Sequence, residues 1–325
     1  MKSIQHIGIL SSGGDSPGMN AAIRAAARTA LYHGLVPYGI QRGYQGLMEG
    51  DLRPLVSRDV SNIIQRGGTI LKSARSEAFR TVEGRRTAYE QVKAHQLDAL
   101  VLIGGDGTIR GAEAFYQEYQ IPAIALPGTI DNDLNGTDFT IGFDTAINTA
   151  VEAIDKIRDT ASSHNRIFLV EVMGRDAGYI ALYSGLACGA EHIFIPENQE
   201  ALDKVIQTIQ DDRQRKKESN IIVIAEGDEF GGADALRQQL SQVIPENTMR
   251  VVILGHIQRG GSPSCMDRIL ASRLGQAAVE GLVQGKVQCM AGLINGEIHY
   301  TPFQDCVKKL KPMPEDMLRM IDQLR

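Results

Sequence analysis

Short apolar runs alternate with helical patterns along the whole chain, and this alternation constrains its fold more than any other feature. Most runs consist of Val, Ile and Leu without alternating polar residues, which is typical of parallel strands buried on both faces. The pattern predicts a doubly wound α/β protein. We expect strands at 4–10, 35–40, 97–103, 122–126, 167–173, 193–195, 220–225, 250–255 and 287–293. We expect helices at 20–33, 86–95, 109–119, 145–160, 201–217, 233–243, 266–283 and 314–324.

Composition excludes several classes of function. The chain has 34 Lys and Arg against 39 Asp and Glu, a formal charge of −5, whereas a general nucleic-acid-binding protein carries a basic surplus. No apolar run approaches the ~20 residues of a membrane span, and the N-terminal segment is too short and polar for a signal peptide. The four cysteines form no Cys-x-x-Cys pair, so neither a zinc site nor disulfides are predicted. We therefore expect a cytoplasmic protein that binds neither nucleic acid nor membranes.

Glycine clusters mark the candidate sites. A length of 325 residues is typical of about two domains, and without a Pro- or Ser-rich linker their boundary is inferred from the loop at 128–142 and the Gly-rich stretch at 255–262. The 34 glycines gather where strands are expected to end. Ligands of open α/β sheets bind at the carboxyl ends of strands. Four such strand-end loops are therefore the candidate sites.

The first strand-end loop is Ser-Ser-Gly-Gly-Asp-Ser-Pro-Gly at 11–18. Its glycines allow backbone N–H groups to approach a phosphate at the start of the next helix. We expect Ser16 to cap that helix and Pro17 to open it. The loop lacks the Gly-Lys-Thr of a P-loop, so a plain turn is an equally good interpretation of these residues alone.

The second loop is Gly-Gly-Asp-Gly-Thr at 104–108. Three glycines leave room for a polyphosphate, and the Asp106 carboxylate can hold Mg²⁺ directly or through water. The alternative is an Asp that only caps the following helix. NAD kinases and lipid kinases share this motif, so it does not by itself distinguish one kinase family from another.

The third loop, at 127–133, carries Asp131 and Asp133. Two carboxylates separated by one residue on a loop after a buried strand indicate function. In an extended loop they point the same way, so they can act together on one metal or hydroxyl, and these residues alone leave the two interchangeable. The alternative is an Asx-turn cluster in a solvated loop.

The fourth loop, at 256–263, follows an expected strand that carries Arg250. We expect Arg250, His256 and Arg259 to form a basic cluster in this acidic protein. Arginine grips phosphate with two parallel hydrogen bonds, so the cluster suits a phosphomonoester. A lone His or Arg here would more often be a surface residue.

Taken in this order, the four loops resemble those of the bacterial-type ATP-dependent 6-phosphofructokinases. The resemblance runs from Gly8 to at least Leu293 and includes motifs at 66–69, 73–75, 155–160, 171–175 and 267–273. This family transfers the γ-phosphoryl group of MgATP to the 1-hydroxyl of fructose 6-phosphate. The resemblance implies two similar doubly wound α/β domains with the active site in the cleft between them. It implies an ATP-binding domain at 1–142 plus 257–304 and a fructose 6-phosphate-binding domain at 143–256 plus 305–325.

The resemblance also implies the roles of individual residues. For ATP binding these are Gly14, Arg75, Ser76, Gly105, Asp106, Gly107 and Thr108, with Asp106 serving Mg²⁺. The catalytic residues are Asp131 as general base, Asp133, Thr129 and Arg175. The sugar phosphate meets Thr129, Ile130, Asp131, Arg166, Met173, Gly174, Arg175, Glu226, Arg250, His256, Ile257, Gln258 and Arg259. In the family Arg166 and Arg250 reach in from a neighbouring subunit, which implies a homo-oligomer, usually a tetramer.

Two glycines favour ATP over pyrophosphate as the donor. In the pyrophosphate-dependent enzymes of the family, Asp typically replaces Gly107 and Lys typically replaces Gly128. A carboxylate at position 107 would crowd and repel the α-phosphate of ATP. NAD kinases lack the third and fourth loops found here. A nucleotide-sensing module without turnover would leave Asp131 and the basic cluster unexplained.

An effector site is the last expectation. On the helix at 20–33, Arg24 and Arg28 lie beside an apolar stripe, a pattern that by itself favours a solvated helix face. The resemblance instead implies a subunit-interface site for ADP or phosphoenolpyruvate. Its residues are Arg24, Arg28, Arg158, Gly189, Glu191, Arg215, Lys217 and Ser219. Ser57 and the carboxylate of Glu218 depart from a more basic pattern and disfavour a multiply charged anion.

Overall fold

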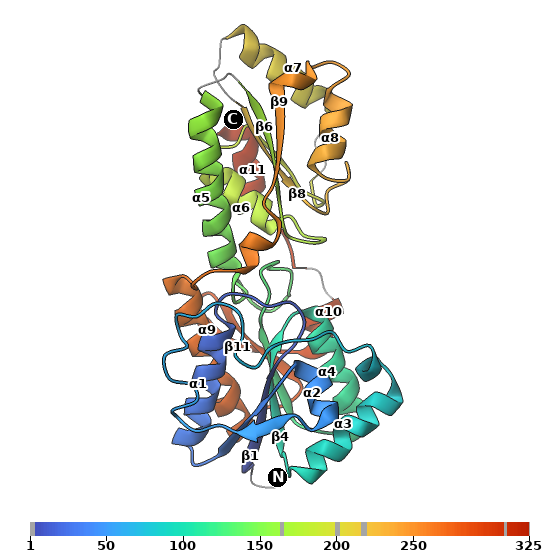
Figure 1. Cartoon of the computed structure of the whole chain (residues 1–325), viewed down its shortest axis with the longest axis vertical. Coiled ribbons are helices and arrows are strands. Elements are labelled where there is room, and N and C mark those ends of the chain that lie inside the picture. Colours follow the sequence, from blue (N-terminus) through green and yellow to red (C-terminus); the bar gives the residue numbers. More distant parts are fainter. Residues whose placement is uncertain (1–3, 163–165, 199–201, 216–219, 309–310, 325) are drawn as a thin grey trace. The chain divides into compact units, whose positions relative to one another are not determined.

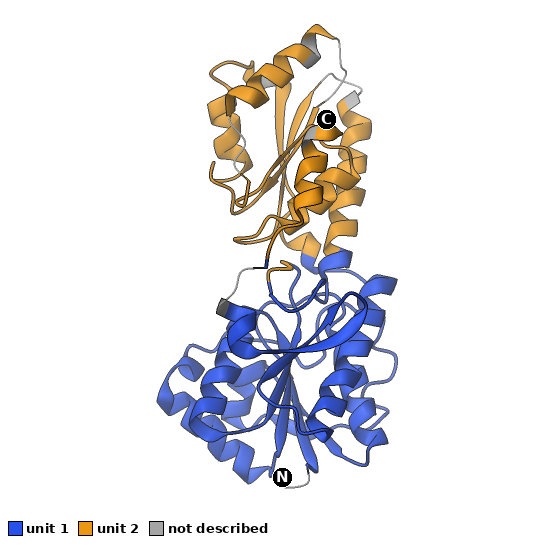
Figure 2. Ribbon diagram, turned by 180° about the vertical axis from the view of Figure 1, so that it is seen from behind, with its two compact units in different colours: residues 1–130, 134–145, 259–311 blue, residues 131–133, 146–258, 312–325 orange. Residues whose placement is uncertain are grey.

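The structure is a computed structural model that describes residues 4–162, 166–198, 202–215, 220–308 and 311–324. The chain divides into two compact units (Figure 2). Unit 1 comprises Met1–Ile130, Leu134–Thr145 and Arg259–Lys311. Unit 2 comprises Asp131–Asp133, Ala146–Gln258 and Pro312–Arg325. The chain passes from unit 1 to unit 2 after Thr145 and returns after Gln258, each within three residues of the expected boundaries after 142 and 256. It passes to unit 2 again after Lys311, whereas the expected boundary followed residue 304. The assignment of one ligand to each unit stays a prediction.

Unit 1 is built on a seven-stranded sheet in the order β11-β10-β5-β4-β1-β2-β3 (Figure 1). Its strands are β1 (His6–Ser11), β2 (Val36–Ile40), β3 (Leu52–Pro54), β4 (Ala99–Gly104), β5 (Ala123–Pro127), β10 (Cys289–Ile294) and β11 (Glu297–Pro302). Only the two edge strands, β3 and β11, pair antiparallel to their neighbours. From β1 the chain adds β2 on one side and β4 on the other. This reversal makes the carboxyl ends of β1 and β4 the expected place for a ligand.

Helices cover both faces of this sheet (Figure 1). Helices α1 (Met19–Tyr32) and α9 (Cys265–Val283) pack on the face that receives Val101 and Ile103. Helices α2 (Gly43–Glu49), α3 (Val82–Ala94), α4 (Asp106–Tyr119) and α10 (Phe303–Lys308) lie on the face that receives Leu100 and Leu102, with the short 3₁₀ helix η1 (Ala78–Arg80). Successive residues of β4 are thus buried on opposite faces, which explains its run of apolar residues without polar alternation.

Unit 2 contains a four-stranded, fully parallel sheet in the order β7-β8-β6-β9. Its strands are β6 (Ile167–Val172), β7 (His192–Phe194), β8 (Asn220–Ala225) and β9 (Met249–Ile253). Helices α7 (Leu202–Gln214) and α8 (Ala233–Leu240) bury one face. Helices α5 (Phe143–Ser162), α6 (Tyr179–Ala187) and α11 (Glu315–Gln323) lie on the other, and η2 (Glu246–Thr248) and η3 (Gly255–Arg259) flank β9 (Figure 1).

The predicted fold class is confirmed, with local differences. The expected helices and strands are found with ends shifted by a few residues, although residues 201, 216 and 217 of the expected helix 201–217 lie outside the described residues. Helices α2, α6 and α10 and strands β3 and β11 were not predicted. The expectation that Ser16 caps the first helix is wrong. The helix begins at Met19 after Gly18, whose φ is 106°. A Cβ at Gly18 would lie 2.7 Å from Cγ2 of Ile141, so both backbone conformation and close packing require glycine there.

Membrane insertion finds no support in the described part of the chain, where no helix combines the length and apolar composition needed to span a bilayer.

Candidate active site

The loops after β1 and β4 meet at the point where the strand order reverses. The Thr108 hydroxyl donates to the Ser12 carbonyl at 3.1 Å, and the Ser12 N–H donates to the Ile103 carbonyl at 3.0 Å. Gly13 has a φ of 86°, and a Cβ there would lie 3.7 Å from the Thr108 hydroxyl. The structure therefore brings the loop that carries Gly14 beside the loop that carries Thr108.

The segment that carries Arg75 and Ser76 lies against the same loop. The Ser73 hydroxyl donates to the Gly13 carbonyl at 2.5 Å, and Arg75 follows two residues later with an exposed side chain. The Ser76 hydroxyl donates to Oε1 of Gln45 at 2.8 Å and accepts from the Phe79 N–H. Arg75 is thus available to solvent, whereas the Ser76 hydroxyl is occupied by the protein.

Arg259 also belongs to this cluster in unit 1. A Cβ built on Gly14 would lie 2.8 Å from Nη1 of Arg259, and Nη1 donates to the Asp15 carbonyl at 3.4 Å. Gly14 therefore leaves the space that this guanidinium fills. Arg259 was expected to bind the sugar phosphate, but its guanidinium lies against the loop of Gly14, which was expected to bind ATP.

Asp106 is the candidate magnesium ligand. It lies in the first turn of α4, its side chain is 30% exposed, and its Oδ1 accepts from Nε of Arg110 at 2.7 Å. No group of three or more His, Cys, Asp or Glu side chains that could hold a metal occurs among the residues that the structure describes. Mg²⁺ commonly takes one or two carboxylates together with substrate phosphates and water. A single accessible carboxylate beside the glycine loops fits that mode of binding.

Two glycines that the sequence links to donor choice differ in their surroundings. A Cβ at Gly107 would meet nothing within 4 Å, so the backbone leaves open space beside Asp106. A Cβ at Gly128 would lie 3.0 to 3.1 Å from Ile103, Gly104 and Met19. Gly128 is therefore in tight packing, and a longer side chain there would have to displace a neighbour.

The third loop begins at the carboxyl end of β5. A Cβ on Gly105 would be 3.6 Å from Cβ of Thr129, which places the start of this loop beside the second loop. The Thr129 carbonyl accepts from the Thr140 hydroxyl at 2.6 Å. Asp131 is 7% exposed, and Asn132, at a φ of 54°, turns the backbone before the half-buried Asp133. The turn places the two carboxylates in unequal surroundings.

In unit 2 the loops after three adjacent strands are joined by backbone-to-side-chain hydrogen bonds. The Arg175 N–H donates to Oε1 of Glu226 at 2.7 Å, and the Met173 N–H donates to Oε1 of Gln258 at 2.8 Å. Arg175 has a φ of 56°, an unusual conformation for a residue with a side chain. Gly174 lies between these two anchored positions, so the turn is held on both sides.

The last residues of unit 2 that were expected to meet substrate differ in exposure. Gln258 is 0% exposed and Ile257 is 59% exposed, while His256 is also exposed. Gln258 therefore braces the Met173 backbone from within. His256 and Ile257 are accessible from outside.

Within one chain, Arg250 and His256 do not come together in the basic cluster that the sequence led us to expect. Arg250 lies near the start of β9 and pairs in register with Phe168, whereas His256 follows the end of that strand. Arg166 immediately precedes β6, so both arginines lie at the amino end of the sheet. A strand rises about 3.3 Å per residue, which places them most of a strand length from Met173. Sequence proximity was misleading because an extended strand separates its two ends.

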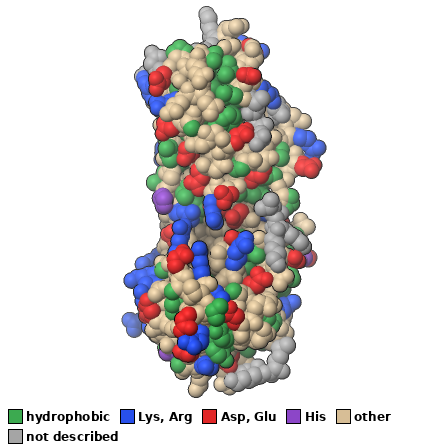
Figure 3. Space-filling view, turned by 90° about the vertical axis from the view of Figure 1, so that its right-hand side faces the viewer, with side chains coloured by type: hydrophobic (Ala, Val, Ile, Leu, Met, Phe, Trp, Pro, Cys, Tyr) green, Lys and Arg blue, Asp and Glu red, His purple; other side chains and the backbone are tan. Residues whose placement is uncertain are grey.

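Charges of both signs are interspersed on the face drawn in Figure 3, although the chain is acidic overall.

The residues expected to bind an effector fall into separate groups. Burial and the nearby charge of Arg28 lower the pKa of Arg24 in unit 1. In unit 2 Arg158 donates to the Gly189 carbonyl at 3.1 Å and lies 4.0 Å from the carboxylate of Glu191. Arg215 is exposed just beyond α7. Lys217 and Ser219 lie outside the described residues.

Three residues that were not among the predicted site residues hold the segments around them. Arg110 pairs with Asp106, and the i, i+4 spacing could have revealed it. The buried Tyr44 hydroxyl donates to the Thr108 carbonyl at 2.6 Å, and burial raises its pKa. Asp267 is 1% exposed and accepts hydrogen bonds from the start of α5. No local sequence signal identifies the partners of Tyr44 or Asp267.

Comparison with known proteins identifies the family. The family model described as Phosphofructokinase matches residues 6–282. The ATP-dependent 6-phosphofructokinase of Cytophaga hutchinsonii is 54% identical over 321 residues, covering 99% of this chain and 98% of that protein. The ATP-dependent 6-phosphofructokinase 1 of Thermus thermophilus is 53% identical over 98% of both chains.

Solved structures agree with this result. Phosphofructokinase from Saccharomyces cerevisiae superposes with a TM-score of 0.87 at 35% identity, over 98% of this chain and 47% of that chain, so this chain spans about half of the yeast chain. The pyrophosphate-dependent phosphofructokinase from Marinobacter aquaeolei superposes with a TM-score of 0.84 at 25% identity, over 96% of this chain and 86% of that chain. The family predicted from the four loops is confirmed: the chain belongs to the phosphofructokinase family.

Proposed function

We propose that the chain is an ATP-dependent 6-phosphofructokinase that transfers the γ-phosphoryl group of ATP to the 1-hydroxyl of fructose 6-phosphate. Curated relatives that carry this name match nearly the full length. The observation that carries the proposal is the meeting of the loops after β1, β4 and β5, which places Ser12, Thr108 and Thr129 together. The class is a glycolytic phosphotransferase that acts on a sugar phosphate.

The nucleotide binds unit 1 in this proposal. Gly14 and Gly105 to Thr108 bring backbone N–H groups towards the phosphates, and the start of α4 adds its helix dipole. Arg75 lies exposed beside this loop and supplies positive charge. When bound, Mg²⁺ neutralises phosphate charge, with Asp106 as its protein ligand. Tyr44 holds the loop from beneath through the Thr108 carbonyl.

Asp131 is the proposed general base. A sugar hydroxyl is a poor nucleophile, so a carboxylate must take its proton as it attacks phosphorus. Asp131 is 7% exposed, whereas Asp133 is half-buried beyond the Asn132 turn. These different surroundings support Asp131 as the base and Asp133 as its support. Thr129 precedes it on the same loop, and Arg175 supplies charge to the transferring group.

The sugar phosphate binds the loops of unit 2. Met173, Gly174 and Arg175 form the turn, Glu226 anchors it, and the exposed His256 lies on the neighbouring loop. Arg166 and Arg250 lie at the far end of the sheet, which supports a role in the site of a neighbouring subunit. The proposed state is therefore a homo-oligomer, with the tetramer of the family as the specific form.

ADP or phosphoenolpyruvate is the proposed effector. Arg24 and Arg28 are close enough for their charges to interact, and a bound anion would relieve that repulsion. Arg158 and Glu191 are held together in unit 2. Cytoplasmic location, also part of the proposal, agrees with a soluble sugar-phosphate substrate.

The test is a coupled assay of the purified chain with fructose 6-phosphate and either ATP or pyrophosphate. We expect turnover with ATP only, and comparable turnover with pyrophosphate would refute the donor assignment. Asp131→Ser should lower kcat by about 10²–10⁴ with little change in KM for either substrate, because the lost interaction acts in the transition state.

Asp133→Ser is the matched comparison for this variant, since it removes the other carboxylate of the same loop. A smaller loss of kcat at 133 than at 131 supports the assignment. Near-normal turnover of Asp131→Ser, or a loss that is overcome by excess Mg²⁺, would show that Asp131 is not the base.

A further inference from the structure

A single buried carboxylate joins the start of α5 to α9. Asp267 lies in the first turn of α9 and is 1% exposed. Its Oδ1 accepts from the Gly142 N–H at 2.8 Å, and its Oδ2 accepts from both the N–H and the hydroxyl of Thr145. One side chain therefore satisfies donors that the beginning of α5 would otherwise leave without partners.

The hydrogen bonds around this carboxylate run in a defined direction. The Thr145 hydroxyl accepts from the Ser264 N–H at 2.9 Å, so its own proton is directed to Asp267. The Ser264 hydroxyl accepts from the Asp267 N–H at 3.1 Å and donates to Oδ2 of Asp144. Each helix start thus caps the other. We call Asp144, Thr145, Ser264 and Asp267 the helix-start clamp.

The helix-start clamp is connected to the third loop through a few backbone contacts. The Ile141 N–H donates to the Pro127 carbonyl at 2.8 Å, so the residues before α5 run beside the end of β5. The Thr140 hydroxyl donates to the Thr129 carbonyl at 2.6 Å. Thr129 is therefore attached to a segment whose next turn is fixed by Asp267.

The first loop rests on the same segment. A Cβ on Gly142 would lie 2.6 Å from Cβ of Ser16, and a Cβ on Gly18 would lie 2.7 Å from Ile141 and 3.5 Å from the Asp267 carbonyl. Both glycines have positive φ. The segment that Asp267 holds is thus packed between the third loop and the first.

We propose that Asp267 is a positioning residue for phosphoryl transfer, whose carboxylate fixes the backbone that holds Thr129 in register. The proposal rests on the proposed function. A buried carboxylate is costly unless its hydrogen bonds are needed, whereas an Asn or Ser cap would hold a helix start more cheaply. The step that depends on it is alignment: a displacement of about 1 Å in a catalytic group can cost about 10² in rate.

The main variant is Asp267→Asn. It keeps the shape of the side chain but replaces one acceptor oxygen with an NH₂ group, so either the Gly142 or the Thr145 donors lose their acceptor. We expect kcat of the folded enzyme to fall about 10- to 100-fold. KM for ATP should stay within about threefold, because Thr108 and Tyr44 hold the second loop independently.

Thr145→Val and Thr145→Ser form a matched pair. Valine removes the hydroxyl that joins Ser264 to Asp267, whereas serine keeps it. We expect Thr145→Val to lower kcat by about 3- to 10-fold and Thr145→Ser to restore it to near wild type. This pair decides the question if Asp267→Asn does not fold.

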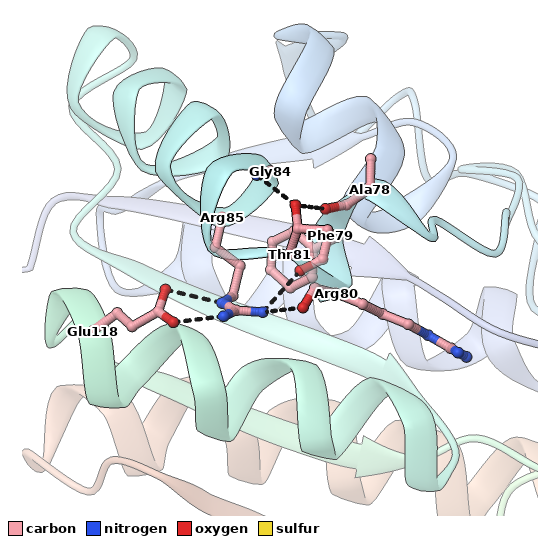
Figure 4. Close-up of polar contacts among 7 residues, drawn as sticks. All are labelled: Ala78, Phe79, Arg80, Thr81, Gly84, Arg85 and Glu118. Atoms are coloured by element: carbon pink, nitrogen blue, oxygen red, sulfur yellow. Dashed lines mark hydrogen bonds and ion pairs between the residues drawn. The ribbon is translucent and has the colours of Figure 1, made fainter.

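An ion pair elsewhere in unit 1, in which the side chains of Arg85 and Glu118 are 11% and 28% exposed, serves as the stability control (Figure 4). Arg85 bonds both carboxylate oxygens of Glu118 and also donates to the Phe79 and Arg80 carbonyls. Glu118 lies near the opposite end of α4 from Asp106. Glu118→Gln should lower Tm without changing kcat.

The outcomes separate positioning from a purely structural role. A kcat of Asp267→Asn within about twofold of wild type at a lower Tm would overturn the proposal, as would equal kcat values for Thr145→Val and Thr145→Ser. An equal fall of kcat in Glu118→Gln would also overturn it, because the effect would then be general destabilisation. Failure of the proposed function would appear differently, as absence of kinase activity in the wild-type chain.

Discussion

Replacing Gly107 by Asp should convert an open position into one that rejects ATP. A Cβ at Gly107 meets nothing within 4 Å, and its φ is not in the left-handed region. The position lies in the first turn of α4, where an added carboxylate interacts favourably with the helix dipole. The fold should therefore tolerate the change, with Tm equal to or slightly above that of the wild type.

The cost to nucleotide binding follows from electrostatics. An aspartate at this position would add a second carboxylate beside Asp106, directed at the proposed phosphate site. Two like charges about 5 Å apart at an effective dielectric constant of about 20 repel by about 3 kcal/mol. That corresponds to about a 100-fold weaker affinity for ATP.

The assay measures KM and kcat for ATP at saturating fructose 6-phosphate, with Tm recorded in parallel. Gly107→Asn is the matched control, since it adds almost the same volume without the charge. We expect KM for ATP to rise much more with Asp than with Asn, while KM for fructose 6-phosphate stays nearly constant. Unchanged ATP kinetics in Gly107→Asp would show that the nucleotide binds elsewhere, and equal effects of Asp and Asn would show that crowding, not charge, dominates.

Three further predictions concern other parts of the molecule. If Arg250 serves a neighbouring subunit, reassembled equal mixtures of inactive Arg250→Ala and Asp131→Ser chains should regain about a quarter of wild-type activity. Half of the sites then contain an intact Asp131, and half of those receive an intact Arg250 from the neighbouring chain. No recovery in confirmed mixed oligomers would place Arg250 in its own chain's site or outside it. Arg110→Met removes an exposed ion pair to Asp106 worth about 0.3–0.5 kcal/mol, so a Mg²⁺ titration of activity should show about a twofold lower requirement, and a higher requirement would mean that Arg110 assists metal binding. Burial raises the pKa of Asp267 to about 6, so the folded state retains a proton that the unfolded state has lost between about pH 4 and 6. The stability advantage of the wild type over Asp267→Asn in urea unfolding should therefore shrink by up to about 3 kcal/mol as pH rises through that window, and an advantage that grows with pH would reverse this sign.

Local sequence determined the elements and the glycine loops of this protein. The apolar runs that became β1, β4 and β6 could be recognised because a strand buried on both faces needs apolar side chains at every position. The loops at 104–108 and 127–133 could be proposed as functional from the sequence because glycines and paired carboxylates after a buried strand have few structural uses. Neither inference depends on distant parts of the chain.

Strand β11 and helix α2 could not be predicted from the local sequence pattern. The strand β11 alternates in exposure and is defined by its pairing with β10. Helix α2 begins with Gly43 and contains Gly46, residues with poor helix propensity. Its conformation depends on packing against η1 and α3, which a local pattern does not contain.

Only the tertiary structure decided which charged residues meet. Arg250 and His256 are six positions apart, yet β9 carries them to opposite ends of its sheet. Asp267 and Gly142 are 125 positions apart, yet they share a hydrogen bond. Sequence specifies the conformation of a segment through short-range preferences, whereas contacts between segments depend on strand direction and helix packing. The hydrogen-bond partners of the Asp267 carboxylate are thus determined by the fold, and no spacing in the sequence predicts them.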